Sequence, residues 1–216
     1  MLLRVARGDI SKMAVDAIVN ASNPTLDGYG GVDGCIRRAA GPVFHQHCRS
    51  VAPIDPGKVI AVPGYELPAT YVINTVAPKC NDENWETILV QCYVSCFQEA
   101  KALGVETLAF PMLGTGAYSL PSAQAAGIAV GAIVNMAQSP GSLREVILVA
   151  HDDQMEHHLK VAVFGDPKPS CDSKMCPACH DCAQFFPLAT ARSKPLNDHS
   201  KEGRCWAWMP TEMELT

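Results

Sequence analysis

Short apolar runs alternate along this chain with longer stretches in which apolar residues recur every three or four positions. The apolar runs span residues 2–6, 16–20, 59–62, 71–76, 107–110 and 145–150, and most are continuous, as in strands covered on both faces. Helical spacing is clearest over residues 83–103, which Gly104 ends, and it returns over 121–138 and after Asp152. Strands alternating with helices predict a three-layer α/β/α sandwich around a mixed, mostly parallel central sheet.

Two Gly-rich loops follow predicted strands. Residues 20–41 read NASNPTLDGYGGVDGCIRRAAG, and residues 111–121 read PMLGTGAYSLP. A loop that joins a strand to a helix presents backbone N–H groups which, with the helix dipole, suit a phosphate or diphosphate. Ligands of such sheets sit beyond the carboxyl ends of the strands, so we expect the two loops to grip one ligand from both sides. The first loop also carries Asp33, an acid that a passive phosphate cradle would not need.

The charge and hydropathy of the chain argue against two classes of function, nucleic-acid binding and membrane association. The chain has 216 residues with 17 basic and 22 acidic side chains, a formal charge of −5, and no Lys/Arg block, which argues against bulk nucleic-acid binding. No apolar run approaches the length of about 20 residues that a membrane span needs. The N-terminus has no signal-peptide pattern, so we expect a cytoplasmic or nuclear protein with no membrane association. Five scattered cysteines in the first 100 residues are interpreted as buried thiols in a reducing compartment.

The composition changes near residue 165. Residues 166–216 contain three Leu, no Ile and no Val, too little apolar surface for an independent core. We therefore predict a folded domain over residues 1–164 and an irregular Cys-rich extension over 165–216. The spacing of Cys171, Cys176, Cys179 and Cys182 lets four thiolates converge on one ion, which predicts a structural zinc site. An iron–sulfur cluster and a tail that binds no metal are the alternatives.

Three polar residues in the loops allow two local interpretations each. Asp9 is either a turn residue that accepts local N–H bonds or a ligand for an amino group. Asn23 is either a loop residue of unusual backbone conformation or a donor and acceptor for ribose hydroxyls. Asp33 is either the N-cap of the following helix or the anchor of a reacting water, and both roles are compatible.

Six blocks in order give the chain a resemblance to a known family. They lie at residues 8–10, 16–23, 30–42, 64–68, 71–76 and 114–118 (GDI, DAIVNASN, GGVDGCIRRAAGP, GYELP, YVINTV and GTGAY). Together they resemble the macro domain family, and within it the MacroD type. The resemblance implies a macro domain that binds ADP-ribose and mono-ADP-ribosylated proteins. It also implies hydrolysis of ADP-ribose esters of protein carboxylates or of the acetyl ester of ADP-ribose. We expect that this chemistry needs no cofactor and that the protein is a monomer.

The resemblance also implies roles for individual residues. Asn23 and Asp33 become the catalytic pair: Asn23 orients the distal ribose, and Asp33 activates or positions the water. Asp9 contacts the adenine amino group. Asn20, at the end of its predicted strand, is interpreted from the sequence alone as a brace for the first loop. The remaining residues of the implied ligand-binding set are Ile10, Gly30, Gly31, Val32, Gly114, Thr115, Gly116, Ala117, Tyr118 and His151.

Departures from the family pattern bear on specificity. Tyr29 interrupts a run of glycines, Asn74 and Ala77 replace a common His and Gly, and His151 stands where relatives often carry an aromatic residue. Two other functions remain open from the sequence. The first is an ADP-ribose reader that binds without cleaving, which has little use for an acid at Asp33. The second is a zinc-dependent interaction protein with a vestigial pocket.

Overall fold

Seven strands form one mixed sheet in the computed structural model, which describes residues 1–28, 30–165 and 211–215. The strands are β1 (Leu2–Arg7), β2 (Ala17–Ser22), β3 (Val59–Pro63), β4 (Tyr71–Val76), β5 (Thr107–Pro111), β6 (Glu145–Ala150) and β7 (Glu212–Glu214). Their order across the sheet is β3-β4-β2-β5-β6-β1-β7. The five inner strands run parallel, and β3 and β7 pair antiparallel at the two edges. The predicted mixed, mostly parallel sheet is confirmed.

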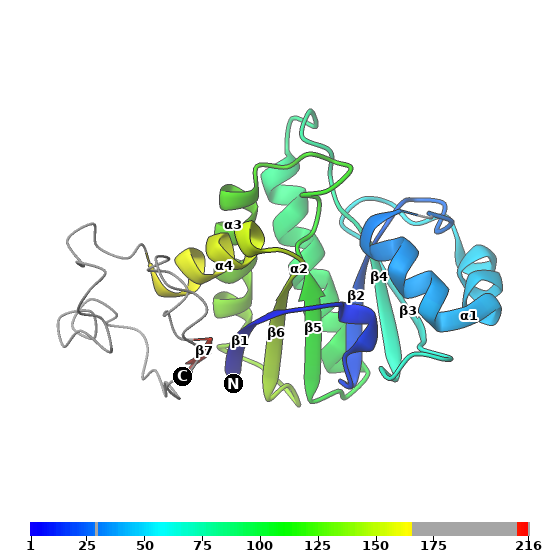
Figure 1. The fold of residues 1–216 in the computed structure, drawn as a ribbon, viewed down its shortest axis with the longest axis horizontal. Coiled ribbons are helices and arrows are strands. Elements are labelled where there is room, and N and C mark those ends of the chain that lie inside the picture. Colours follow the sequence, from blue (N-terminus) through cyan, green and yellow to red (C-terminus); the bar gives the residue numbers. More distant parts are fainter. Residues whose placement is uncertain (29, 166–210, 216) are drawn as a thin grey trace.

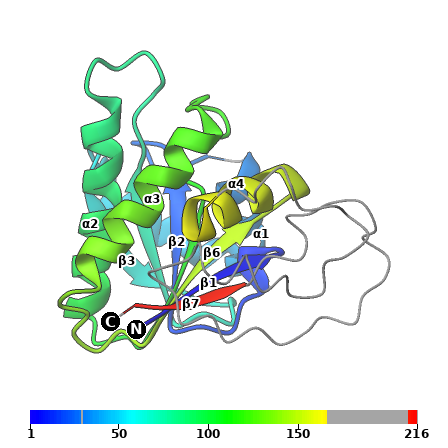
Figure 2. The same ribbon diagram turned by 90° about the vertical axis from the view of Figure 1, so that its left-hand side faces the viewer.

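Helices cover both faces of the sheet (Figures 1 and 2). They are η1 (Ile10–Lys12), α1 (Gly31–Val51), α2 (Trp85–Ala102), α3 (Ser122–Met136) and α4 (Asp153–Phe164). Strand β6 shows the division, because Val146 and Leu148 belong to the core under α2, α3 and α4, whereas Ile147 and Val149 belong to the core under α1 and η1. Alternate side chains of one buried strand thus supply two hydrophobic cores, as the continuous apolar run predicts.

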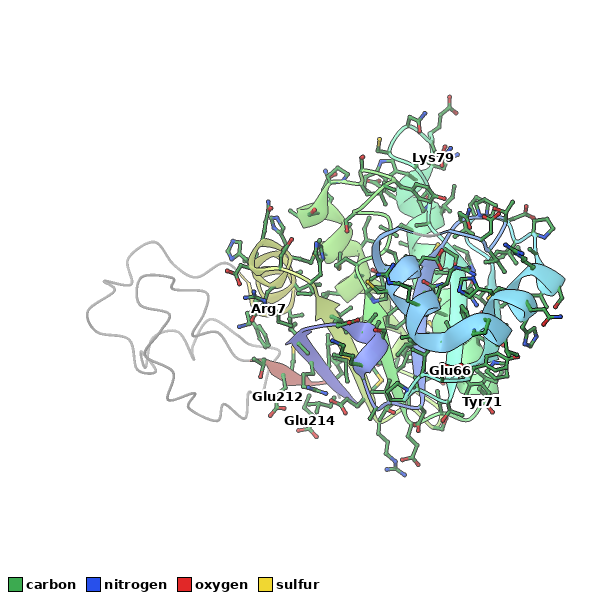
Figure 3. The ribbon with its side chains drawn as sticks, turned by 45° about the vertical axis from the view of Figure 1, so that its right-hand side comes forward. Arg7, Glu66, Tyr71, Lys79, Glu212 and Glu214 are labelled. Carbon is green, nitrogen blue, oxygen red and sulfur yellow. The ribbon has the colours of Figure 1, made fainter. Side chains whose placement is uncertain are left out.

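Parallel pairing sets which loops share a rim. Because β1, β6, β5, β2 and β4 run the same way, the segments that follow their last residues all leave one edge of the sheet. Figure 3 shows the two rims: Lys79, just after β4, lies at the opposite end of the molecule from Tyr71, where β4 begins. The two Gly-rich loops follow β2 and β5, so both lie at the carboxyl rim, as predicted.

Residues near the C-terminus form an edge strand of the sheet, and the sequence did not predict this strand. Strand β7 pairs with β1 through the register Leu2↔Glu214 and Arg4↔Glu212. The Met1 ammonium also donates to the Leu215 carbonyl at 2.9 Å, and Leu215 N donates to Met1 O at 2.8 Å. The predicted irregular extension therefore does not include these residues, which complete the sheet beside β1. The four predicted zinc ligands, Cys171, Cys176, Cys179 and Cys182, lie outside the described residues, as does Tyr29.

None of the helices in the described ranges has the length and apolar character that crossing a membrane requires.

Candidate active site

Helix α1 begins one turn earlier than an N-cap at Asp33 would require. Its N-cap is Gly30, Gly31 is the first helical residue, and Asp33 lies inside the first turn. The interpretation of Asp33 as the N-cap is therefore wrong. Gly31 itself has a φ of 54°, which is outside the helical range and which glycine adopts without a Cβ penalty, so regular helical backbone begins directly after it. The first N–H groups of an α-helix have no carbonyl partners within it, so those at the start of α1 can donate to a ligand.

Asp33 is buried, and a single one of its two oxygens is engaged. The side chain of Asn20 donates to Asp33 Oδ1 at 2.7 Å, and Arg37 Nε donates to the same oxygen at 2.8 Å. Asp33 Oδ2 has no hydrogen-bond partner among the described residues. A Cβ on Gly28 would collide with that oxygen, so Asp33 Oδ2 lies directly against the backbone of the first loop. This oxygen has no donor in the described part of the chain, but it is buried beneath the first loop, so a water or a ligand hydroxyl reaches it only when the backbone at Gly28 moves aside.

Asn20 contributes to the site through its hydrogen bond to Asp33. It is fully buried at the carboxyl half of β2, and its side-chain amide also donates to Asn74 Oδ1 at 2.9 Å. Asn74 lies directly opposite on β4 and accepts a second bond from Ser22 Oγ at 3.1 Å. The bracing role predicted for Asn20 agrees with these bonds, and they give Asn74, one of the departures from the family pattern, a place in the support of Asp33.

Asn23 organises the first loop. Its amide donates to Thr25 Oγ1 at 3.0 Å and to Asp27 Oδ1 at 2.8 Å, and its oxygen accepts from Asp27 N at 3.0 Å. The Thr25 hydroxyl also donates to Asp27 Oδ1, and this bond, with a smaller effect from the Asn23 amide, lowers the pKa of the Asp27 carboxyl. Asn23 Oδ1 also lies 3.8 Å from where a Cβ of Gly28 would stand, so Asn23 and Asp33 border the same glycine. The predicted catalytic pair is therefore brought together.

The second loop leaves the same rim after β5 and carries Tyr118, which is half-buried against the core under α2, α3 and α4. Burial, and secondarily the charge of Asp33, raise the pKa of the Tyr118 phenol. The turn before it depends on Gly114, whose φ is 76° and whose Cβ would collide with Leu120. Gly116 and Ala117 are exposed, and Thr115 is half-buried. The Gly116 carbonyl accepts from Ser119 N at 2.9 Å within the loop.

The predicted adenine-side residues differ in accessibility. Asp9 caps η1 by accepting from Ser11 N at 3.0 Å and from Ser11 Oγ at 2.7 Å, and the hydroxyl bond is the main reason that the pKa of Asp9 is lowered. Asp9 is exposed, so the local turn role does not prevent a ligand contact. The Ile10 side chain is buried in the core beneath η1. The His151 ring is 69% exposed and lies 3.0 Å from Asp152 Oδ2.

Val32 is half-buried against the core under α1, and Gly30 and Gly31 are exposed at the rim. Arg37 was not among the predicted site residues. Its signal in the sequence is the four-residue spacing from Asp33, which on a helix brings two side chains together.

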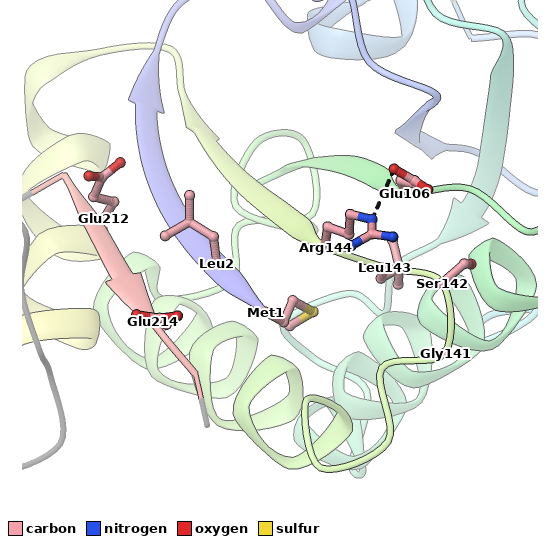
Figure 4. Close-up of a pocket in the computed structure, with 9 residues that line it drawn as sticks. All are labelled: Met1, Leu2, Glu106, Gly141, Ser142, Leu143, Arg144, Glu212 and Glu214. Atoms are coloured by element: carbon pink, nitrogen blue, oxygen red, sulfur yellow. Dashed lines mark ion pairs between the residues drawn. The ribbon is translucent and has the colours of Figure 1, made fainter.

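A cavity of about 700 Å³ lies away from this site, at the amino ends of the strands (Figure 4). Its lining comes from the start of β1, from β7 and from the turn before β6, and includes the Glu106–Arg144 ion pair at 3.1 Å. The candidate site at the carboxyl rim rests instead on Asp33 and the two loops.

No group of three or more His, Cys, Asp or Glu side chains that could hold a metal ion occurs in the described part of the chain.

Comparison with known proteins identifies the family. The model of the Macro domain matches residues 19–129. The chain is 39% identical over 158 residues to an O-acetyl-ADP-ribose deacetylase of Citrobacter rodentium, which covers 70% of this chain and 89% of that protein. It is 46% identical over 131 residues to the human ADP-ribose glycohydrolase MACROD2, covering 59% of this chain but 31% of that protein.

A solved structure gives the same answer for the fold. The Trypanosoma brucei macrodomain in complex with ADP-ribose superposes with a TM-score of 0.69 at 31% identity, covering 73% of this chain and 67% of that one. The sheet, with helices on both faces and both Gly-rich loops at its carboxyl rim, defines a three-layer α/β domain. The chain belongs to the macro domain family.

Proposed function

We propose that this macro domain binds ADP-ribose at its carboxyl rim and hydrolyses ADP-ribosyl esters. The named activities of its relatives, a deacetylase of O-acetyl-ADP-ribose and an ADP-ribose glycohydrolase, support this class of reaction. The observation that carries the proposal is Asp33: a buried carboxylate with Oδ1 held by two donors and Oδ2 free against Gly28. A module that only binds the ligand has little use for such an acid.

The rim suits each part of ADP-ribose. Backbone N–H groups of residues 30–32 and 114–117 face the diphosphate, in keeping with a chain that has no basic block. Asp9, at the end of β1, is the acceptor for the adenine amino group. Asn23, which borders Gly28 together with Asp33, and Tyr118 of the second loop receive the distal ribose. For Asn23 to bond the ribose, hydroxyl groups of the ligand take the place of its bonds to Thr25 or Asp27.

The reaction follows from the free oxygen. Asp33 Oδ2 accepts a hydrogen bond from a water and orients it. The water oxygen bonds to the anomeric carbon of the distal ribose, the bond from that carbon to the ester oxygen breaks, and the electron pair leaves with the protein carboxylate. The proton of the water passes to a ligand phosphate oxygen or to solvent. With the acetyl ester, the water oxygen bonds instead to the acetyl carbonyl carbon, and the bond from that carbon to the ribose oxygen breaks. The electron pair leaves with the ribose oxygen, which takes up one proton of the water, and the acetic acid formed loses its proton to solvent, so the products are ADP-ribose and acetate.

Incubation of the full chain with a protein mono-ADP-ribosylated on glutamate tests the proposal, with O-acetyl-ADP-ribose as a second substrate. We expect wild type to release ADP-ribose from both. Asp33→Asn should lower kcat by about 10²- to 10⁴-fold, the usual contribution of a positioned acid or base, with little change in ADP-ribose affinity. Glu106→Gln is the matched control, because that carboxylate is 57% exposed at the opposite rim. Tight ADP-ribose binding by wild type without release from either substrate would establish a reader instead.

A further inference from the structure

Arg37 is an arginine enclosed in the protein core. Its side chain is 1% exposed and is the largest of the fully buried side chains in the described chain. Arginine is rarely buried unless it is paired, and here the pair is Asp33, one helical turn away on α1. Arg37 Nε donates to Asp33 Oδ1, whereas Nη1 and Nη2 have no hydrogen-bond partner among the described residues.

Phe44 and Cys48 are close to the Arg37 guanidinium and enclose it beside Asp33. The guanidinium carbon lies 5.6 Å from the centre of the Phe44 ring, a cation–π contact with the part of α1 that follows its kink at Gly41. The thiol of Cys48 lies near the same group: burial raises the pKa of that thiol, while the charge of Arg37 acts to lower it. Asp33 is the one carboxylate that forms an ion pair with Arg37 within the described residues.

Stability alone does not account for this arrangement. A buried ion pair contributes little net stability compared with apolar side chains of the same volume, because both charges lose their hydration. What the pair does provide is orientation. Arg37 and Asn20 both donate to Oδ1, which fixes the rotation of the carboxylate and leaves Oδ2 as its single free acceptor, turned toward Gly28.

We propose that Arg37 is a positioning residue for the hydrolysis: its permanent charge keeps Asp33 oriented with Oδ2 toward the reacting water. The inference rests on the proposed function and deepens it. Arg37 does not touch the substrate, and it acts through Asp33. Its removal therefore misplaces the water without removing any ligand contact.

A double-mutant cycle tests this. Arg37→Met and Asp33→Asn are made singly and together in the full chain, with ester hydrolysis and ADP-ribose affinity measured for each. A misplaced reacting group costs up to about 10²-fold in rate, so we expect Arg37→Met to lower kcat by about 10- to 100-fold while the Kd for ADP-ribose changes by less than about 3-fold. In the Asp33→Asn background the same substitution should change kcat by less than about 2-fold, because residues that act as a unit are not additive.

Two further variants keep the test decisive. Arg38→Met is the matched control, because Arg38 is the exposed neighbour on the same helix, and its kcat should equal that of wild type. Arg37→Lys retains the charge and should recover part of the lost rate; it carries the comparison if Arg37→Met does not fold. An unchanged kcat in Arg37→Met, or an equal loss in both backgrounds, overturns the positioning role while the hydrolase proposal stands. Absence of turnover in wild type overturns both.

Discussion

Replacing Asp33 by alanine should do more than remove a reacting group. The side chains of Arg37 and Asp33 are 1% and 6% exposed, so Asp33→Ala leaves a guanidinium buried without its counter-charge. Removing one partner of a buried ion pair typically destabilises a protein by about 3–5 kcal/mol. The free energy of unfolding of a typical domain is about 5–15 kcal/mol, so this loss would remove a large part of the stability of the protein.

Urea denaturation of the full chain, under reducing conditions, measures this effect. We expect Asp33→Ala to lower the free energy of unfolding by about 3–5 kcal/mol. The double variant Asp33→Ala/Arg37→Met should recover at least half of that loss, since it removes both charges. Asp33→Asn should lose less than Asp33→Ala because it keeps an oxygen for Arg37 Nε.

The matched control is Glu106→Ala, which strands Arg144 in an ion pair whose side chains are 57% and 76% exposed. An exposed pair is worth about 0–1 kcal/mol, so this variant should remain close to wild type. The reasoning is refuted if Asp33→Ala unfolds within about 1 kcal/mol of wild type, or if the double variant is no more stable than Asp33→Ala. The practical consequence is that Asp33→Asn, and not Asp33→Ala, reports on catalysis.

Three other predictions follow from the loops and the extension. Gly28→Ala should abolish most ester hydrolysis while the fold is kept, because its Cβ meets Asp33 Oδ2; Gly127→Ala, on the exposed face of α3 with open space around it, should have wild-type kcat. Thr25→Ala should raise the pKa of Asp27, because the Thr25 hydroxyl is the main group that lowers it. An NMR titration of the Asp27 carboxyl carbon measures the shift, and an unchanged pKa contradicts a contribution from this bond. Elemental analysis of the full chain should find one zinc that is lost when the four predicted cysteine ligands become serine, whereas iron or no metal would contradict the zinc prediction.

The layout of the sheet could be predicted because its signals are local. Continuous apolar runs such as residues 145–150 mark buried parallel strands, and glycines such as Gly104 mark helix ends. The position of the loops at one rim then follows from strand direction alone. Strand β7 could not be predicted, because three residues with two glutamates carry no apolar run, and their pairing with β1 joins opposite ends of the chain.

The hydrogen bonds that hold Asp33 could not be predicted from the sequence, for a different reason. The bond between Asn20 and Asn74 depends on the register of β2 against β4, which a sequence pattern does not fix. The spacing of Asp33 and Arg37 indicates a helical ion pair, but exposed pairs are the common case, and burial comes from packing by Phe44 and its neighbours. The start of α1 at Gly31 depended on the backbone angles of the loop and not on the capping preference of Asp33.

The central claim is that Asp33 Oδ2 orients the water that cleaves an ADP-ribosyl ester. Single-turnover release of ADP-ribose from a glutamate-linked mono-ADP-ribosylated protein, with the full chain in excess, measures that step apart from substrate binding and product release. The account predicts complete release by wild type and a rate lowered by about 10²-fold or more in Asp33→Asn at equal ADP-ribose affinity. Equal rates for the two proteins, or no release by a wild type that binds ADP-ribose tightly, would contradict it.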